Sequence, residues 1–193
     1  MALKLAVFIS GGGTNLQALI DACREGSLKA EVAAVISNNS KAYGLERARQ
    51  VGIAAYHISA KIYPDEAARL EALRKTLQNH RIDLIVLAGY MKLLPSKLVK
   101  QYYGRIINIH PALLPKYGGK GMHGLNVHKA VIDSRAKYSG ATVHMVDERY
   151  DNGAILVQRR VPVLPDDTPE TLAARVLEIE HKILPLAVSL FIK

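Results

Sequence analysis

Apolar residues along the chain follow two alternating patterns, and each pattern predicts a different kind of element. Short apolar runs bounded by glycine or polar residues are typical of strands, whereas apolar residues recurring every three or four positions are typical of helices. In the first two thirds of the chain the short runs predict strands at residues 4–9, 31–36, 54–58, 83–88 and 105–109. Helical spacing predicts helices between them, at residues 14–25, 43–51, 65–79 and 96–102.

This alternation of strands and helices with short turns predicts an α/β fold with an open, mostly parallel, doubly wound sheet. The pattern changes after Pro115, where residues 117–122 read as a flexible, glycine-rich loop. A helix at residues 125–133 and two polar-alternating strands at 138–146 and 155–163 follow, and such strands favour antiparallel additions in the C-terminal part. Thr168 is a candidate cap for a last helix over residues 169–192, with Pro185 as a candidate kink.

Composition limits the class of protein. The chain has 193 residues, of which 49% are hydrophobic and 22% charged, so we expect one domain over residues 1–193 with a full core. Disorder, a fibre and a disulfide scaffold are excluded, and the lone Cys23 cannot pair within the chain, which fits a reducing compartment. No apolar run approaches the roughly 20 residues of a membrane span. We therefore expect a cytoplasmic protein with no membrane partner.

The net charge of +9 raises the question of an anionic partner. The lysines and arginines are scattered, and only Arg159 and Arg160 form a tight doublet. This distribution favours an ordinary solvated surface, then a basic funnel for small anionic ligands, and nucleic acid last. We expect small-molecule substrates and no nucleic acid. The sequence does not distinguish a monomer from a weak homodimer.

Three glycines, Gly11 to Gly13, connect the first predicted strand to the helix that begins at Thr14. Glycine permits close approach of a ligand to the backbone, and a helix N-terminus offers free N–H groups and partial positive charge to a phosphate. Neither Gly-x-Gly-x-x-Gly nor a Walker lysine is present. A phosphate site and a merely tight turn therefore both remain open from these residues alone.

The segment Asn108-Ile109-His110-Pro111 is the most informative stretch of the chain. Side chains alternate along a strand, so Asn108 and His110 are expected on one face, and Pro111 is expected to end the strand. Ligands of open α/β sheets bind at the carboxyl ends of the strands. There Asn108 can donate to a developing oxyanion while His110 moves a proton, which suits acyl or formyl transfer. The alternative is a polar pair that only satisfies buried backbone groups.

A second histidine, His144, precedes an acidic turn, and a carboxylate near His110 would raise its pKa and orient it. Asp147, Glu148 and Asp151 compete for that role, and spacing alone does not choose between them. His123 and His128 stand without a ligand cluster at zinc-like spacing, so no metal site is expected.

These residues carry a resemblance that covers nearly the whole chain. The chain resembles the phosphoribosylglycinamide formyltransferases, which are folate-dependent formyl transferases. The resemblance rests on Ser10-Gly-Gly-Gly-Thr-Asn-Leu-Gln-Ala, Gly44-Leu-Glu-Arg-Ala-Arg, Leu87-Ala-Gly-Tyr-Met, Ile107-Asn-Ile-His-Pro-Ala-Leu-Leu-Pro-Lys-Tyr and Asp151-Asn-Gly. It implies transfer of formyl from 10-formyltetrahydrofolate, used as co-substrate, to the amine of 5'-phosphoribosylglycinamide in purine synthesis.

The resemblance also implies roles for individual residues. Asn108, His110 and Asp151 match the catalytic triplet, with His110 as proton shuttle, Asp151 holding it charged and Asn108 polarising the formyl oxygen. His144 matches a supporting histidine. The implied binding residues are Gly13, Thr14 and Asn15 for the ribonucleotide phosphate, Glu180 for the glycinamide amine, and Met91, Lys92, Leu93, Leu94 and Asn108 for the folate.

By the same resemblance, phosphate binding falls in about residues 1–100, and catalysis and folate binding in about 101–193. Leu114–Pro115 matches a bond that the family holds in cis. Methionyl-tRNA formyltransferases and formyltetrahydrofolate hydrolases share the Asn-x-His-Pro core, but each carries a further domain that we do not expect in 193 residues. A basic nucleotide-binding module without catalysis would need only the glycine turn and the positive charge, and would have no use for a converging Asn108, His110 and Asp151.

Overall fold

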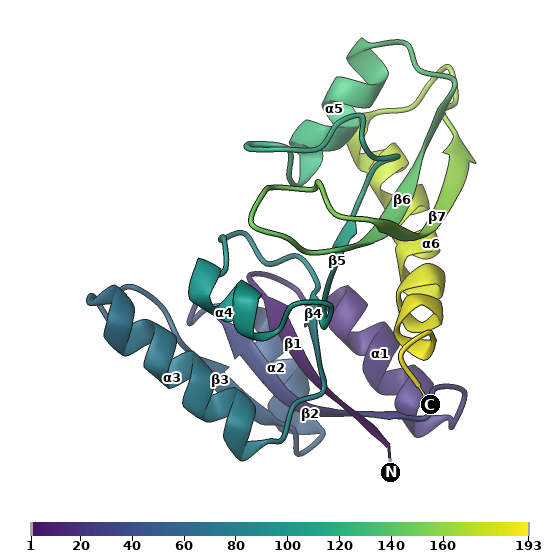
Figure 1. Cartoon of the computed structure of the whole chain (residues 1–193). Helices are drawn as coiled ribbons and strands as arrows, with labels where there is room; N and C mark the ends of the chain where they lie inside the picture. Colours follow the sequence, from purple (N-terminus) through teal and green to yellow (C-terminus); the bar gives the residue numbers. More distant parts are fainter. Residues whose placement is uncertain (1, 193) are drawn as a thin grey trace.

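The computed structural model describes residues 2–192, and a seven-stranded sheet forms its centre (Figure 1). The strands are β1 (Leu3–Ile9), β2 (Ala30–Ser37), β3 (Ala54–His57), β4 (Leu84–Leu87), β5 (Ile106–His110), β6 (Tyr138–Met145) and β7 (Ile155–Pro162). The helices are α1 (Thr14–Arg24), α2 (Tyr43–Gln50), α3 (Glu66–Asn79), α4 (Ser96–Gln101), α5 (Leu125–Asp133) and α6 (Pro169–Ser189).

The strand order is β3-β2-β1-β4-β5-β6-β7, with two kinds of pairing. The first five strands pair in parallel, and β6 and β7 then add antiparallel to β5. The order reverses direction between β1 and β4, which places a crevice at the carboxyl ends of these strands. The predicted fold class is confirmed, including the antiparallel C-terminal part.

Helices cover both faces of the sheet, as alternation along β1 shows. Leu5, Val7 and Ile9 point into a core shared with α1, α2 and α6, whereas Ala6 and Phe8 point into a core shared with α3 and α4. A strand buried on both faces must be apolar at every position, which explains the continuous run in the sequence. The two cores hold the carboxyl ends of β1, β4 and β5 in fixed relative positions.

The last helix is shorter than the sequence predicts, ending at Ser189 rather than Ile192. The N–H groups of Leu190, Phe191 and Ile192 each bond to the carbonyl three residues earlier, so the chain tightens into turns there. Helix α6 continues through Pro185. At its start Thr168 and Thr171 form a reciprocal capping box, as the predicted cap requires.

Two further features concern the chain beyond β5. The Leu114–Pro115 peptide bond is cis, as the resemblance implies. Residues 117–122 form turns rather than regular structure, with Gly119 and Gly121 at positive φ.

Within residues 2–192, none of the helices combines the length and the apolar character needed to cross a bilayer.

Candidate active site

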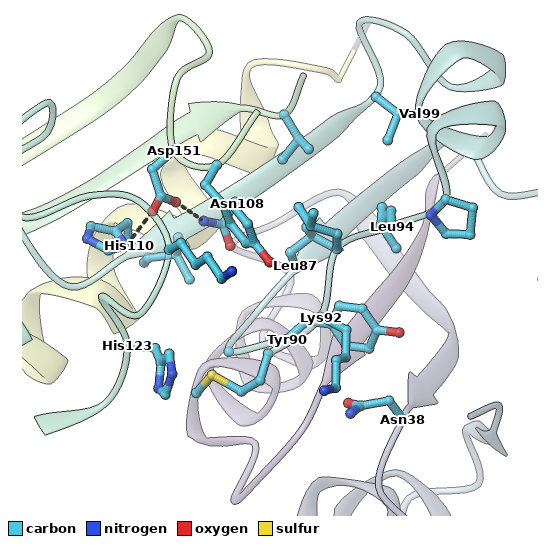
Figure 2. Close-up of a pocket in the computed structure, with 18 of the residues that line it drawn as sticks. Asn38, Leu87, Tyr90, Lys92, Leu94, Val99, Asn108, His110, His123 and Asp151 are labelled. Carbon is cyan, nitrogen blue, oxygen red and sulfur yellow. Dashed lines mark hydrogen bonds and ion pairs between the residues drawn. The ribbon is translucent and has the colours of Figure 1, made fainter. Parts of the chain in front are cut away.

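A large cavity opens at the carboxyl ends of the parallel strands, as their order predicts. Its volume is about 1190 Å³, above the roughly 300–1,000 Å³ usual for a single small-molecule site. Its walls include Leu87 at the end of β4, Asn108 and His110 at the end of β5, and the loop around Tyr90 (Figure 2). The space is sufficient for two small molecules side by side.

Strand β5 brings two candidate side chains to one face. Asn108 and His110 both contact Asp151, so the predicted alternation along the strand is confirmed. In the antiparallel register of β5 and β6, His144 lies opposite Asn108 and Thr142 lies opposite His110. The sheet therefore assembles the site from two neighbouring strands.

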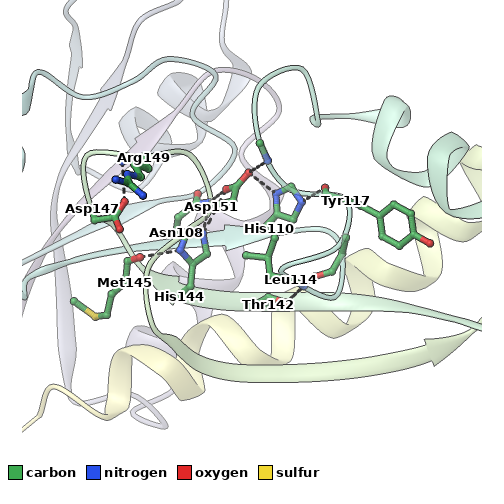
Figure 3. Close-up of polar contacts among 12 residues, drawn as sticks. Asn108, His110, Leu114, Tyr117, Thr142, His144, Met145, Asp147, Arg149 and Asp151 are labelled. Atoms are coloured by element: carbon green, nitrogen blue, oxygen red, sulfur yellow. Dashed lines mark hydrogen bonds and ion pairs between the residues drawn. The ribbon is translucent and has the colours of Figure 1, made fainter.

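Of the three candidate carboxylates, the structure brings Asp151 to the histidines (Figure 3). Its Oδ2 lies 3.7 Å from Nδ1 of His110, and its Oδ1 lies 3.5 Å from Nε2 of His144. Asp147 instead accepts bonds from the Arg149 N–H and from Asn152, and Glu148 pairs with Lys100. Burial alone raises the pKa of Asp151, but contacts with His144, the Gly119 N–H and His110 lower it below its usual value.

The hydrogen bonds of His110 determine which of its nitrogens can titrate. Nε2 lies 2.8 Å from the carbonyl oxygen of Tyr117, which can only accept, so Nε2 carries a proton. The second proton therefore binds and leaves at Nδ1, beside Asp151. By the family resemblance, Asp151 is expected to raise the pKa of His110 and hold it charged. Burial is the largest influence and lowers that pKa, as does the nearby His144, while Asp151 and the Tyr117 carbonyl raise it, and the pKa lies below its ordinary value.

Asn108 and His144 form a second linked pair. His144 Nδ1 donates to the Met145 carbonyl at 2.8 Å, and Nε2 of the same ring lies 3.1 Å from Asn108 Nδ2. Asn108 Nδ2 also donates to Asp151 Oδ1 at 3.4 Å. The amide nitrogen faces His144 and Asp151, so only by giving up the longer contact can it donate to a ligand.

Glu180 meets Asn15 on the side of the cavity formed by helices α6 and α1, and both residues line the cavity. Asn15 Nδ2 donates to Glu180 Oε2 at 2.5 Å, and Asn15 Oδ1 is buried without a partner among residues 2–192. Burial raises the pKa of Glu180 to about 7, although the bond from Asn15 lowers it. A buried carboxyl and an unpaired amide oxygen fit a ligand that supplies hydrogen-bond donors.

The glycine turn adopts the geometry that its composition suggests. Gly13 is the cap of α1 with φ 72°, and a Cβ there would lie 2.7 Å from the backbone of Gly44. Arg47 Nε donates to the Gly12 carbonyl at 2.8 Å, which ties the turn to α2. Asn15 lines the cavity, whereas Gly13 and Thr14 precede it in the same turn and do not.

The five candidate folate residues, Met91 to Leu94 and Asn108, all line the cavity. Met91 and Leu93 are 48% and 54% exposed, whereas Leu94 is buried. The Met91 N–H donates to Ser10 Oγ, which anchors the start of this loop to the glycine turn. Exposed apolar side chains on a cavity wall suit a flat aromatic ligand, and the residues present therefore fit a folate.

Sequence reasoning missed two backbone groups of the segment after Pro115. The Tyr117 carbonyl accepts from His110, and the Gly119 N–H donates to Asp151 Oδ2 at 2.8 Å. A Cβ on Gly118 would lie 3.1 Å from that of Asp151 and closer still to Leu114. The paired glycines were the available signal, since a glycine pair permits such close approach.

His123 lines the cavity, in the segment before α5. His128 is buried on α5, where burial and the nearby His110 lower its pKa. Across the part of the chain that the structure describes, no three His, Cys, Asp or Glu side chains are grouped so as to hold a metal ion.

Comparisons with known proteins agree on one family. A family model described as formyl transferase matches residues 3–188. The chain is 47% identical over 181 residues to the chloroplastic phosphoribosylglycinamide formyltransferase of Arabidopsis thaliana, covering 93% of this chain and 62% of that protein. It is 45% identical over 188 residues to phosphoribosylglycinamide formyltransferase of Haemophilus influenzae, covering 97% and 86% respectively.

A solved structure agrees with these relatives. Glycinamide ribonucleotide transformylase 1 from Symbiobacterium toebii superposes with a TM-score of 0.91 at 44% identity, covering 98% of this chain and 87% of that one. The chain spans about three fifths of the length of two plant relatives, 62% of the Arabidopsis thaliana protein and 58% of the chloroplastic phosphoribosylglycinamide formyltransferase of Vigna unguiculata.

Proposed function

The chain belongs to the formyl transferase family, and on that premise we propose that it formylates 5'-phosphoribosylglycinamide. The donor is 10-formyltetrahydrofolate, and the products are formylglycinamide ribonucleotide and tetrahydrofolate, a step of de novo purine biosynthesis. The names of the relatives support formyl transfer to this acceptor. The observation that carries the proposal is the meeting of Asn108, His110 and Asp151 on the wall of one cavity.

The reaction moves one proton as well as the formyl group. 10-Formyltetrahydrofolate supplies the formyl carbon, which leaves a folate nitrogen and bonds to the substrate amine. The amine must lose a proton and the departing nitrogen must gain one, so a group that takes up and returns a proton is needed. His110 Nδ1 is that group, because Nε2 stays bonded to the Tyr117 carbonyl and Nδ1 lies beside the Asp151 carboxylate.

Asp151 and Asn108 act on charge. Asp151 stabilises the ring while Nδ1 is protonated, which offsets part of the cost of charging a buried imidazole. Asn108 Nδ2 exchanges its 3.4 Å contact with Asp151 for the oxygen on which negative charge develops. His144 supports it by accepting the shorter bond and holding the amide plane in place.

The binding residues divide between two ligands. Gly13, Thr14 and Asn15 present the N-terminal N–H groups of α1 to the ribonucleotide phosphate, where the helix dipole also favours a negative charge. The Glu180 carboxylate accepts from the glycinamide amine and stands beside Asn15. The folate lies against Met91, Lys92, Leu93 and Leu94, with Asn108 at its reactive end.

Assembly and compartment are part of the same proposal. The protein works in the cytoplasm as a monomer or weak homodimer, with small molecules rather than nucleic acid as its partners. Size-exclusion chromatography with light scattering over a range of protein concentrations measures the assembly state directly.

A competition assay tests the proposed activity. Purified protein receives 10-formyltetrahydrofolate labelled in the formyl carbon, with phosphoribosylglycinamide, initiator methionyl-tRNA and water as competing acceptors. The label should pass to the ribonucleotide, and His110→Ala should abolish most of that transfer. Release of labelled formate would instead indicate a hydrolase, and labelled tRNA a tRNA formyltransferase, and either result would overturn the proposal.

A further inference from the structure

Three side chains form a row across neighbouring strands beside the proposed proton shuttle. His110 on β5 lies opposite Thr142 on β6, and Thr142 lies opposite Gln158 on β7. Both pairings are antiparallel, so the three residues share one face of the sheet. Only His110 has a part in the proposed chemistry.

The side chain of Thr142 is fully buried, and its hydroxyl uses every one of its hydrogen-bonding positions within the protein. Its Oγ1 donates to the Ala112 carbonyl at 2.6 Å and accepts from the Leu114 N–H at 3.2 Å. It also accepts from Gln158 Nε2 at 2.9 Å. A hydroxyl has one donor and two acceptor positions, so no capacity remains.

Gln158 completes the same network from the next strand. The Nε2 that bonds to Thr142 also donates to the Leu114 carbonyl at 3.1 Å. Thr142 and Gln158 together therefore make three bonds to the backbone of Ala112 and Leu114. The intervening Leu113 packs against Gly140 on β6, where any Cβ would collide with it.

The backbone held by this network leads directly to the second contact of His110. Residues 111–116 connect His110 to Tyr117, whose carbonyl oxygen lies 2.8 Å from His110 Nε2. Tyr117 has a φ of 57°, a left-handed conformation unusual for a residue with a side chain, and its hydroxyl bonds to Ser134 at 2.6 Å. A carbonyl in such a conformation stays in place only where the surrounding chain holds it.

We propose that Thr142 and Gln158 are positioning residues, which hold the 112–114 backbone so that the Tyr117 carbonyl keeps the proton of His110 on Nε2. This inference rests on the proposed function, because it gives the Nδ1 position of His110 to the shuttled proton. Neither residue lines the cavity proposed to hold the substrates. Their effect reaches the reaction only through the imidazole.

Other groups act on the same ring from other sides. Asp151 raises the pKa of His110, His144 lowers it, and His128 on α5 lies close enough to interact with it. None of these three bonds to Thr142 or Gln158. A substitution of Thr142 or Gln158 should therefore change the contact between Tyr117 and His110 and leave the charges around the His110 ring unaltered.

The test compares Thr142→Val, which keeps shape and loses the hydroxyl, with Thr142→Ser, which keeps the hydroxyl. The measurement is the ¹⁵N chemical shifts of the His110 ring during a pH titration of the ligand-free protein, which report tautomer and pKa. Thr142→Val should mix the tautomers and lower the pKa, because the Tyr117 carbonyl favours the protonated ring. It should also lower kcat by roughly ten- to a hundredfold with little change in either KM. Thr142→Ser should keep the tautomer and pKa of His110, and kcat, close to those of the parent.

Thr76→Val is the matched control. Thr76 is buried on α3, and its hydroxyl bonds only to the Ala72 carbonyl within its own helix, so the His110 signals should not move. Gln158→Leu repeats the test at a partly buried position, with the same direction of change expected. An unchanged His110 tautomer and pKa in folded Thr142→Val or Gln158→Leu would overturn the inference.

The titration separates this inference from the proposed function. The ¹⁵N shifts need no substrate, so they can support the positioning network even if the competition assay identifies a different acceptor. A normal titration in Thr142→Val combined with normal ribonucleotide formylation would overturn the positioning inference alone.

Discussion

Asn15 donates a hydrogen bond of 2.5 Å to Glu180, although 165 residues separate them. The bond joins the first turn of α1 to the middle of α6 and places a carboxyl group in the interior beside the glycine turn that we propose binds the phosphate. Burial there raises the pKa of Glu180 to about 7. Stability and the proposed contact with the substrate amine therefore place opposite demands on this residue.

Glu180→Gln should therefore make the free protein more stable at alkaline pH. A carboxyl that is easier to protonate when folded adds stability below its unfolded pKa, near 4.5, and loses that contribution as pH rises through about 7. At pH 8 the variant should exceed the parent in unfolding free energy by up to about 3 kcal/mol, and at pH 4 the two should coincide. Urea denaturation across this range measures the difference.

The exposed Glu178→Gln, on the same helix, is the control and should show no such pH-dependent gain. Glu180→Gln should also bind phosphoribosylglycinamide more weakly, because an uncharged amide attracts the substrate amine less strongly. Stability curves for Glu180→Gln and the parent that run parallel from pH 4 to 8 would show that Glu180 does not titrate in this window.

Asp151→Asn should lower the pKa of His110 further. The carboxylate raises that pKa, the amide carries no charge, and burial continues to favour the neutral ring. The limb of the kcat–pH profile that His110 governs should move to lower pH together with the ring's NMR titration. Asp147→Asn, in the same turn but bonded to Arg149 and Asn152, should leave the titration in place. Equal His110 titrations in Asp151→Asn and the parent would mean that Asp151 does not control the ring.

His110→Ala should reduce kcat by at least about a hundredfold, the scale expected of a positioned acid–base group. Its dissociation constant for phosphoribosylglycinamide should change little, because the proposed contacts come from α1 and Glu180. Calorimetry measures the binding and a rapid-quench assay the turnover. His80→Gln, whose ring bonds to Tyr56 away from the site, should keep normal turnover. Near-normal turnover in His110→Ala would remove this residue from the mechanism.

Gly13→Ala should weaken ribonucleotide binding by at least about tenfold, equivalent to 1.4 kcal/mol. Its φ is 72°, and the new Cβ would lie 2.7 Å from the Gly44 Cα, so the turn must move. Gly26→Ala has a φ of 76° and nothing within 4 Å of its Cβ, so it bears only the backbone strain, about 1–2 kcal/mol. Chemical denaturation and calorimetry on both variants separate the two effects. If Gly13→Ala binds the ribonucleotide as tightly as Gly26→Ala and the parent do, this turn does not hold the phosphate.

Local sequence patterns predicted much of the site, but not which residues from other elements contact Asn108 and His110. Strand alternation placed Asn108 and His110 on one face, because that depends only on the two-residue period of a strand. The choice among Asp147, Glu148 and Asp151 depended on how the turn folds back. Asp151 adopts a φ of 49° and meets the histidines, while Asp147 bonds within its own turn.

The charge state of His110 was also beyond prediction from spacing. A neighbouring carboxylate suggested a charged ring, and burial outweighs it. Burial at the end of β5 results from packing by β6 and the segment after Pro115, which no local pattern describes. Thr142 and Gln158 escaped notice for the same reason, since their meeting with residues 112–114 follows from strand register.

The sequence alone determined the elements, their α/β alternation and the edge of the sheet at which chemistry belongs, because these follow from periodicities spanning a few residues. The resemblance already implied Asp151 as the carboxylate beside His110, whereas only the tertiary structure decided that Glu180 reaches Asn15 and that Tyr117 turns its carbonyl to the ring. Each of these contacts joins separate elements, and its geometry depends on strand register and helix packing, which are set by the whole core.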